Sequence, residues 1–480
     1  MICPCLAAVE WSKTEVASVD PSDPTKMGKR AAEEEDGEAD VGALSKRGKR
    51  VMNTPLLPYM AGVIDGAVNP YSLETGQGVF ALAVAENKLA HDVLEPRVKA
   101  AFANMPTPTF SYNIMHGWQS ARESVAALMR EHFCKDVKCV GPVADEIICT
   151  AGAAAALTHI FYCICEAGDV CLVPSPYYSA FDYDLSALAE VKINPVPLAP
   201  ENGYALTPAM LDDACKRAER EQGRFPRVLL LTNPHNPLGR IMPPAELQAL
   251  MDWCDAHEVH LVADEIYALS CFGQHLTSST SKSFVSIGEM LKGTLGPRRH
   301  VVWALSKDFG ASGWRAGILW TQNKALHEAV SHMAVFSGIA GPLQSVIEQI
   351  FNDRAFMEAY LVENSKRLAA SCDLVTKALR EMEIPYLQPE GGMFVWCDCR
   401  QLLKLALPSN PASNEAEDSL YNALWKEARV VITPGLAQHQ TEPGWFRVCF
   451  AAVKPAVLEL AMQSFKEWVA SRKASVAIQS

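Results

Sequence analysis

Short apolar runs recur along the middle of the chain, from about residue 105 to 345, and longer segments with helical periodicity separate them. The apolar runs include "EIICTAG", "VCLVPS", "RVLLLT", "VHLVAD" and "HVVWALS". Residues 243–258 begin with prolines and carry apolar residues at helical spacing, which predicts a helix. Continuous apolar strands that alternate with helices are typical of βαβ units. We therefore predict an α/β fold around a mostly parallel sheet that is covered on both faces.

The pattern changes in the last part of the chain. A long helical segment over residues 354–383 is followed by the apolar stretches "GGMFVWCD", "ARVVITPG" and "GWFRVCFA" and by a final helix that we expect to end near Trp468. This indicates a smaller α+β domain. We assign residues 105–345 to the large domain, residues 56–104 and 346–470 to the smaller one, and residues 471–480 to a tail.

The first 55 residues differ in composition from the rest. They are charged, contain few aromatic residues, and carry basic clusters at Lys29–Arg30 and Lys46–Arg50. Such segments cannot bury enough apolar surface to fold, so we predict a disordered tail. The two clusters also resemble a bipartite nuclear import signal. We favour a solvated tail over that alternative.

Composition excludes several classes of function. The chain has 480 residues, of which 49% are hydrophobic, and a net charge of −12, which argues against a nucleic-acid partner. No apolar run reaches the roughly 20 residues of a membrane span, and the N-terminus lacks the pattern of a signal peptide. The 15 cysteines lie mostly in apolar runs, without the spacing of a usual zinc site. We expect no metal site, and buried free thiols in a reducing compartment such as the cytoplasm.

Polar residues stand at the ends of several predicted strands, where packing alone does not require them. They are Asn236 after "LLLTNPH", Asp264 and Tyr267 in "VADEIY", Lys307 after "VVWALS", and Arg315 eight residues later. Each has a structural explanation by itself, as a turn, a helix cap or a surface residue. Ligands of such sheets bind beyond the carboxyl ends of the strands. The recurrence of polar groups there predicts one shared ligand.

Pyridoxal 5'-phosphate is a cofactor that accounts for this set of residues. A lysine on a rigid strand can form a Schiff base with its aldehyde, and a buried carboxylate can keep its ring nitrogen protonated. An arginine and the N-terminus of a helix can hold its phosphate. The small residues of "TAGAAAAL", at 150–157, would allow close approach to such a helix start. Tyr178, in "PSPYY", is placed to stack on the ring.

Several blocks of the sequence resemble a known family. "NPHNPLGR", "ADEIYA" and "ALSKDFGASGWRAG" are similar to the signature blocks of class I/II aminotransferases of fold type I. "LAVAENKL", "GGMFVWCDCRQLL" and "PGLAQHQTEPGWFRVCFA" resemble, more narrowly, the 1-aminocyclopropane-1-carboxylate (ACC) synthase branch. The resemblance covers about residues 66 to 465. It implies a pyridoxal-phosphate enzyme with a large and a smaller domain, and a homodimer with its active sites at the subunit interface.

The resemblance also implies roles for individual residues. For the cofactor, Lys307 is the Schiff-base lysine and proton shuttle, Asp264 pairs with the ring nitrogen, Asn236 and Tyr267 meet the phenolic oxygen, Tyr178 stacks on the ring, and Arg315, Ser306, Ala154 and Ala155 surround the phosphate. For the substrate, Arg447 binds the α-carboxylate and Glu86 is a substrate-side acid. Arg447 as a surface ion pair, and Glu86 as a helix-start carboxylate, are the alternatives.

This chain departs from the family pattern at a few positions. Ala304 stands where a phosphate-binding serine is frequent, and Ala155 where a threonine is common. Plant-type ACC synthases place a tyrosine directly before the His-Gly pair, where this chain has Met115. Tyr112 lies three residues earlier, in a setting that resembles other members of the group. The resemblance implies that this tyrosine reaches the cofactor of the partner subunit.

The reaction itself stays open at the level of sequence. Transamination, ACC formation from S-adenosylmethionine and β-elimination share their first steps, so the fold decides the cofactor better than the reaction. We favour an aminotransferase and keep ACC synthase and a β-eliminating lyase as alternatives. A pyridoxal-phosphate-binding regulator without catalytic activity is the alternative of another class. A transcription regulator of that type would need a DNA-binding domain, for which the acidic tail is no candidate.

Overall fold

A computed structural model of the chain describes residues 43–54, 57–276 and 283–479. The chain divides into two compact units between Met60 and Ala61. The predictions for residues 1–42, including the basic cluster Lys29–Arg30, lie outside the described residues. Among the described helices, none is long and apolar enough to cross a bilayer.

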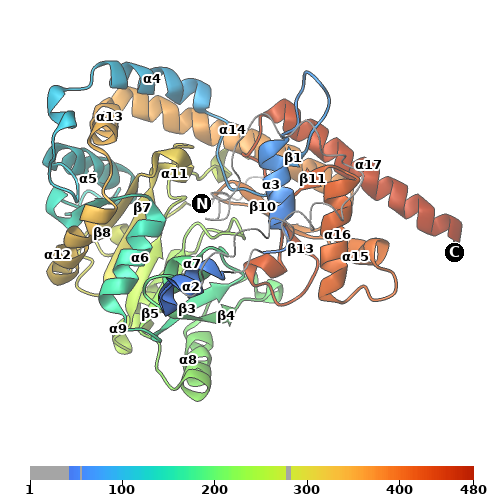
Figure 1. Cartoon of the computed structure of the whole chain (residues 1–480), viewed down its shortest axis with the longest axis horizontal. Coiled ribbons are helices and arrows are strands. Elements are labelled where there is room, and N and C mark those ends of the chain that lie inside the picture. The colour runs from blue at the N-terminus through green and yellow to red at the C-terminus, as the bar shows by residue number, and fades with distance from the viewer. Residues whose placement is uncertain (1–42, 55–56, 277–282, 480) are drawn as a thin grey trace. The chain divides into compact units, whose positions relative to one another are not determined.

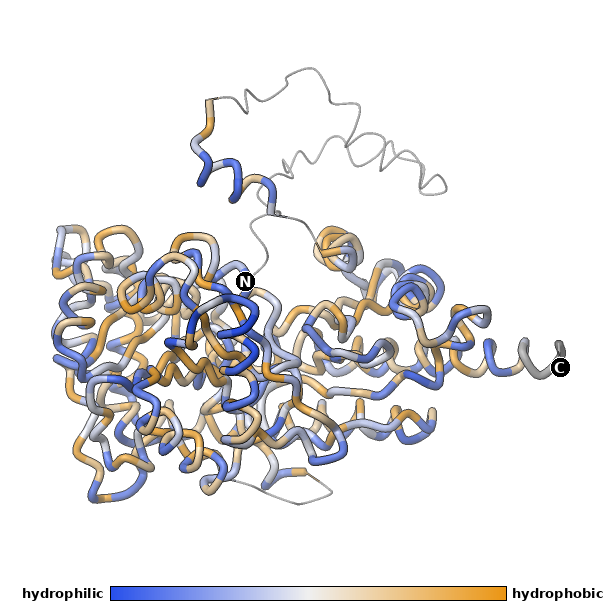
Figure 2. The backbone as a smooth tube through the Cα atoms, turned by 90° about the horizontal axis from the view of Figure 1, so that it is seen from below, coloured by the Kyte–Doolittle hydropathy of each residue, from blue (hydrophilic) through white to orange (hydrophobic). Residues whose placement is uncertain are grey.

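The described part of the N-terminal unit contains the helix α2 (Lys46–Met52). We predicted disorder as far as residue 55, and this was wrong for these residues. Ser45 caps the helix, because its Oγ accepts a hydrogen bond from the amide of Gly48 at 3.1 Å. Lys49 and Arg50 lie in the last turn, where positive charge is favourable. Figure 2 shows α2 as mostly hydrophilic, in line with its basic residues.

A seven-stranded sheet lies at the centre of the larger unit, with the order β2-β8-β7-β6-β5-β3-β4 (Figure 1). β8 is antiparallel to both of its neighbours, and the other adjacent pairs are parallel. The predicted α/β fold with a mostly parallel sheet is therefore confirmed. The strands are β2 (Ile147–Thr150), β3 (Val170–Ser175), β4 (Lys192–Pro197), β5 (Val228–Thr232), β6 (His260–Asp264), β7 (Arg299–Ala304) and β8 (Gly317–Thr321).

Both faces of this sheet are buried. Along β7, Val301 and Trp303 belong to one hydrophobic cluster, and Val302 and Ala304 belong to the other. Helices α6, α7 and α12 cover the second face, whereas α4, α5, α8, α9, α13 and α14 contribute to the first. These helices are α4 (His91–Ala103), α5 (Gln119–Phe133), α6 (Ala153–Ile164), α7 (Phe181–Ser186), α8 (Pro208–Gln222), α9 (Pro244–Ala256), α12 (Lys324–Met333), α13 (Gly341–Asn352) and α14 (Arg354–Glu381).

A second, antiparallel sheet has the order β12-β13-β10-β9, and β1 pairs in parallel with β11. Figure 1 shows α3, β1 and β11 on the same side as α15, α16 and α17. Segments from the two ends of the larger unit therefore lie together, as expected for the smaller domain. These elements are β1 (Phe80–Ala81), β9 (Tyr386–Leu387), β10 (Phe394–Asp398), β11 (Val430–Val431), β12 (Thr433–Pro434), β13 (Trp445–Cys449), α3 (Met60–Val68), α15 (Arg400–Ala406), α16 (Asn414–Lys426) and α17 (Pro455–Gln479).

The predicted division into a large and a smaller domain stays a prediction. The structure shows what α4 packs against and where α17 ends. α4, which we placed in the smaller domain, packs against α13. α17 runs to Gln479 instead of ending near Trp468, so residues 471–479 are helical rather than a tail. The described cysteines are free thiols and most are buried, as expected.

Candidate active site

Lys307 lies just beyond the carboxyl end of β7, in the short helix α11 (Leu305–Asp308). Its Nζ donates a hydrogen bond to the carbonyl of Ala85 at 2.5 Å. Burial lowers the pKa of Lys307 to about 8, although Cys449, Glu86 and other nearby groups partly offset this effect. About a tenth of this amine is therefore uncharged at pH 7, far more than for an exposed lysine.

Asp264 ends the neighbouring strand β6, and its Oδ1 accepts a hydrogen bond from the amide of Ile266 at 3.3 Å. Burial raises the pKa of Asp264 to about 7. The carboxyl of Asp184, in α7, adds to this effect, whereas Lys307 opposes it. Burial likewise raises the pKa of Asp184 to about 7. The site thus holds a carboxyl group that needs a cationic partner to stay ionised in its buried position.

Arg447 in β13 reaches from the antiparallel sheet to the end of the central sheet. Its Nη1 donates to Oδ1 of Asn236 at 2.8 Å, and its Nη2 donates to Oγ1 of Thr433 at 3.1 Å and to the carbonyl of Ala83. The guanidinium also lies over the ring of Phe394, 5.3 Å from its centre. Its Nε is buried without a hydrogen-bond partner. Arg447 is therefore fixed in place while part of its donor set stays unused.

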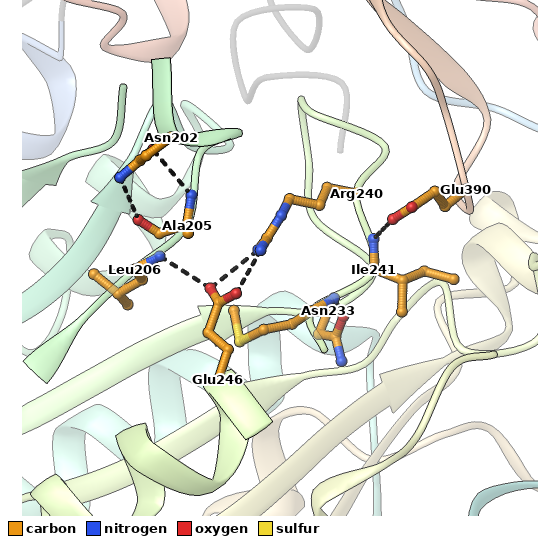
Figure 3. A network of polar contacts seen from close by, with 9 residues as sticks. Asn202, Ala205, Leu206, Asn233, Arg240, Ile241, Glu246 and Glu390 are labelled. Atoms are coloured by element: carbon orange, nitrogen blue, oxygen red, sulfur yellow. Dashed lines mark hydrogen bonds and ion pairs between the residues drawn. The ribbon is translucent and has the colours of Figure 1, made fainter. Parts of the chain in front are cut away.

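A polar network holds the loop after β5 that carries Asn236 (Figure 3). Arg240 pairs with both carboxylate oxygens of Glu246, one of them at 3.0 Å, and Glu246 also accepts from the amide of Leu206 at 2.9 Å. On the other side, the amide of Ile241 donates to Glu390 at 2.9 Å. The C-terminal end of the loop that presents Asn236, at Arg240 and Ile241, is thus held by two carboxylates.

Arg315 lies against the turn that begins α6. Its Nη1 donates to the carbonyl of Ser312 at 2.9 Å and its Nη2 to that of Ala151 at 3.4 Å. Gly152 caps the helix with a φ of 89°, and a Cβ there would come within 3 Å of the Arg315 guanidinium. Ala154 and Ala155 lie in the first turn of α6, where backbone N–H groups have no partner within the helix. These donors and Arg315 form an anion-binding corner.

The remaining predicted residues line the same region, with one exception. Tyr267 is buried and packs edge-on against Phe394, with 5.4 Å between ring centres. Tyr178 packs edge-on against Phe181 at 5.4 Å. Ser306 is buried directly before Lys307. Tyr112 is the exception, because it is 96% exposed on the surface.

Glu86 lies beside Lys307 and is fixed by two contacts. Its Oε1 accepts from Oγ of Ser312 at 3.0 Å, and its Oε2 is 3.4 Å from Nζ of Lys88. Burial alone would raise its pKa, but Lys88, Ser312 and Lys307 together keep the pKa of Glu86 below its ordinary value. This carboxylate is therefore ionised at neutral pH.

Sequence reasoning missed several residues of the site. Asp184 lies near Asp264 and Cys449 lies near Lys307, and each influences the pKa of its neighbour. The carbonyls of Ala83 and Ala85 accept hydrogen bonds from Arg447 and Lys307. The alternation of β13 places Cys449 on the same face as Arg447, so this residue could have been found from its spacing. Backbone carbonyls leave no signal in the sequence.

Comparisons with known proteins decide the family. Residues 67–465 match the family model of aminotransferase class I and II. This chain belongs to that family. It is 33% identical over 435 residues to 1-aminocyclopropane-1-carboxylate synthase 1 of Oryza sativa subsp. indica, covering 86% of this chain and 85% of the relative. A 1-aminocyclopropane-1-carboxylate synthase of Glycine max is also 33% identical, over 431 residues, covering 87% of this chain and 86% of that protein.

Solved structures show the same fold. An aspartate aminotransferase double mutant of Thermus thermophilus superposes with a TM-score of 0.71 at 21% identity, covering 88% of this chain and 99% of the other. An aromatic aminotransferase of Pyrococcus horikoshii OT3 gives a TM-score of 0.68 at 22% identity, covering 84% and 98%. The predicted family and fold are confirmed, and the chain is a pyridoxal-phosphate-dependent enzyme. The alternative of a non-catalytic regulator is set aside.

The residues of the site fit this cofactor. A partly uncharged lysine, a buried carboxyl and an anion-binding corner lie at the ends of adjacent strands, β6, β7 and β8. They match an aldehyde, a ring nitrogen and a phosphate. A Cβ at Gly152 would meet the Arg315 guanidinium, so the position of this arginine depends on the glycine there. The chemistry of this donor set therefore agrees with the family.

Proposed function

We propose that this enzyme is an aminotransferase acting on an α-amino acid through Lys307. The observation that carries the proposal is the pairing, within one site, of a partly uncharged lysine and a fixed arginine with an unused donor. A base for the α-proton and a clamp for the α-carboxylate are the groups that every reaction of this type needs on the protein side.

In this proposal the described residues hold the cofactor in the following way. Lys307 would bind its aldehyde carbon, Asp264 its ring nitrogen, Asn236 and Tyr267 its phenolic oxygen, Tyr178 its ring face, and Arg315, Ser306 and the first turn of α6 at Ala154 and Ala155 its phosphate. The cofactor supplies an electron sink for the charge that develops at the substrate α-carbon.

The protein's own groups then act on the substrate. Arg447 binds the α-carboxylate through the planar fork of its guanidinium, which lysine cannot reproduce. Asn236, Thr433 and the carbonyl of Ala83 keep that fork in one orientation. Nζ of Lys307 would take the proton from the substrate α-carbon. Because these groups are buried, water is excluded from the proton transfer.

Met115 favours transamination over ring closure. It stands at the position directly before His116, and its thioether cannot donate a hydrogen bond. Transamination needs no group beyond those named above.

ACC synthase is the second candidate, and Glu86 favours it. An ionised carboxylate beside Lys307 would attract a positively charged substrate such as S-adenosylmethionine. The curated relatives named above carry this activity in their names. A β-eliminating lyase would use the same site and stays a third alternative.

A product assay tests the proposal. The holoenzyme is incubated with amino acids plus a 2-oxo acid, and separately with S-adenosylmethionine. A new amino acid without ACC supports the aminotransferase. ACC together with methylthioadenosine would instead establish the second candidate. The Lys307→Ala variant is the control, because it should lose both turnover and the visible absorption of the lysine-linked cofactor.

We also infer a homodimer in which Tyr112 serves the active site of the partner. Tyr112 is 96% exposed beside other exposed apolar side chains, Phe110, Val335 and Phe336. A Cβ on Gly338 would lie at 2.5 Å from the carbonyl of Met115, so the two segments that carry these side chains are adjacent. Several large exposed apolar side chains on adjacent segments support an interface at this surface.

We propose that the enzyme acts in the cytoplasm, because its described thiols are free and mostly buried. Imaging of a fluorescent fusion tests this. Exclusion from the nucleus is the expected result, whereas nuclear accumulation that disappears when Lys46, Arg47, Lys49 and Arg50 are replaced would contradict it.

A further inference from the structure

The 3₁₀ turn η10 (Leu436–Gln438) connects β12 to β13 and meets the segment that follows β3. Beyond the turn, Nε2 of His439 lies 2.6 Å from Oδ2 of Asp182 in α7. The other oxygen of the same carboxylate, Oδ1, accepts a hydrogen bond from the Tyr177 hydroxyl at 2.8 Å. One carboxylate thus joins a side chain from the β12–β13 connection to one from the segment that follows β3.

Three more contacts reinforce this junction. The rings of Tyr177 and His439 stack, with 4.2 Å between their centres and 15° between their planes. The amide of Tyr177 donates to the carbonyl of Gln438 at 2.8 Å, and Oγ of Ser175 donates to the carbonyl of His439. His439 has a φ of 62°, in the left-handed region that non-glycine residues rarely adopt. The surrounding contacts hold it there.

The junction lies directly beside two residues of the active site. Tyr177 precedes Tyr178, the residue assigned to the face of the cofactor ring. On the other side, Arg447 pairs in register with Thr433 of β12, the strand that leads into the turn. The two chain segments joined at Asp182 are therefore those that present Tyr178 and Arg447.

We propose that Asp182, Tyr177 and His439 form a clasp that sets the position of Tyr178 relative to Arg447. These three are positioning residues, since they act through their neighbours and do not touch the substrate. The inference rests on the roles proposed above for Tyr178 and Arg447. The clasp keeps Tyr178, which would stack on the cofactor ring, and Arg447, which would bind the carboxylate, at a fixed separation.

An ordinary surface ion pair lacks the ring stacking and the backbone hydrogen bonds that surround the contact between Asp182 and His439. The pair of Lys466 and Glu381 is similarly exposed, with 43% and 42% of the side chains accessible against 35% and 47% for His439 and Asp182, and its distance is 2.7 Å. That pair joins two helices at a single contact between the charged atoms. It therefore provides a matched control for the loss of a half-exposed ion pair.

His439→Asn and Asp182→Asn are the test variants, and Glu381→Gln is the control. Asparagine tolerates the left-handed backbone of residue 439 but lacks the ring. Asp182→Asn keeps the shape of the side chain and removes its charge. If His439→Asn does not fold, Asp182→Asn alone decides the test.

Two measurements need no turnover. Hydrogen exchange of the Tyr177 amide in the holoenzyme should speed up about fivefold in both variants, the size expected for a lost half-exposed pair, and stay unchanged in the control. The visible circular dichroism of the bound cofactor should change in the test variants only. Normal exchange and an unchanged signal in both test variants would overturn the clasp.

Kinetics provide the third measurement. KM for the amino acid should rise several-fold while kcat changes less, because the misplaced arginine weakens carboxylate binding. A fall in kcat alone would contradict the proposal. If no transamination is detected in the unchanged enzyme, the proposed function fails, whereas the exchange and dichroism data still decide whether the clasp exists.

Discussion

Lys307 has to be uncharged before it can bond to an aldehyde, and its surroundings control this at the level of a single residue. Burial lowers its pKa to about 8, so the protonated form dominates below that pH and the uncharged form above it. We expect the rate at which the apoenzyme takes up pyridoxal phosphate to rise as the pH increases towards 8 and to level off beyond it. Stopped-flow absorbance measures this rate. A rate that still rises steeply well above pH 8 would contradict the proposed environment of the amine.

Arg447 offers a second test at this scale. Replacement by lysine keeps the charge but loses the fork and leaves Oδ1 of Asn236 without its partner. We expect Arg447→Lys to lower kcat/KM for the amino acid about 100-fold, in keeping with the loss of two hydrogen bonds to a charged group. The cofactor spectrum should be retained. Arg400→Lys, which alters a half-buried ion pair with Asp398, is the control and should leave kcat/KM unchanged. Equal effects of both substitutions would argue against a role of Arg447 in binding the carboxylate.

Asp264 and Asp184 show how far single residues could be predicted from sequence. Asp264 stands out because it ends an apolar strand, and together with the polar residues at the other strand ends this position pointed to a ligand. Asp184 lies in "FDYDLSAL", where its polar character fits any amphipathic helix. Its burial results from the packing of α7 on the sheet, which the local sequence does not encode. The partners of Lys307 and Arg447 among the backbone carbonyls were hidden for the same reason.

At the level of elements, the start of α6 depends on the absence of a side chain at Gly152. We expect Gly152→Ala to weaken the binding of pyridoxal phosphate by at least tenfold, because the new methyl group would displace the Arg315 guanidinium. Gly203→Ala is a matched control, since Gly203 also has a positive φ, of 66°, but a methyl group there would meet no atom within 4 Å. The control should cost only about 1 kcal/mol of backbone strain. Fluorescence titration and thermal unfolding of the apoenzyme separate the two effects. If the affinity for the cofactor fell equally in both variants, backbone strain alone would explain the loss, and contact of the new methyl group with Arg315 would not be needed.

The apolar runs predicted β2, the parallel inner strands β3, β5, β6 and β7, and the helices α9 and α14, because buried parallel strands are apolar on both faces. β8 is also an inner strand and was not predicted. β4 was not predicted, since "KINPVP" contains polar residues and prolines and forms an edge strand. The end of α17 was missed because its support is distant in sequence. Arg472 pairs with Glu427, and Lys473 lies 3.3 Å from Glu383. Tertiary contacts of this kind extend a helix beyond its own periodicity.

At the level of the whole molecule, the proposed dimer makes each active site a product of two chains. If Tyr112 serves the partner's site, a chain with Lys307→Ala and a chain with Tyr112→Ala are each nearly inactive as homodimers. A hybrid of the two contains one site with both residues intact and one with neither. Random mixing after unfolding and refolding makes half of the dimers hybrids, so about a quarter of all sites should regain activity.

The mixing experiment tests whether Tyr112 acts in the partner's active site, because activity can be recovered only when the two kinds of subunit exchange. Mixing without prior dissociation should recover little activity, and recovery should depend on protein concentration during refolding. A second mixture, of Lys307→Ala with Arg447→Ala, is the control. Both residues belong to the same chain's site, so every site in that hybrid lacks one of them and no activity should return. If the first mixture also stays inactive while sedimentation shows hybrids, Tyr112 does not act across the interface. The 96% exposure of Tyr112 would then require another partner for that surface.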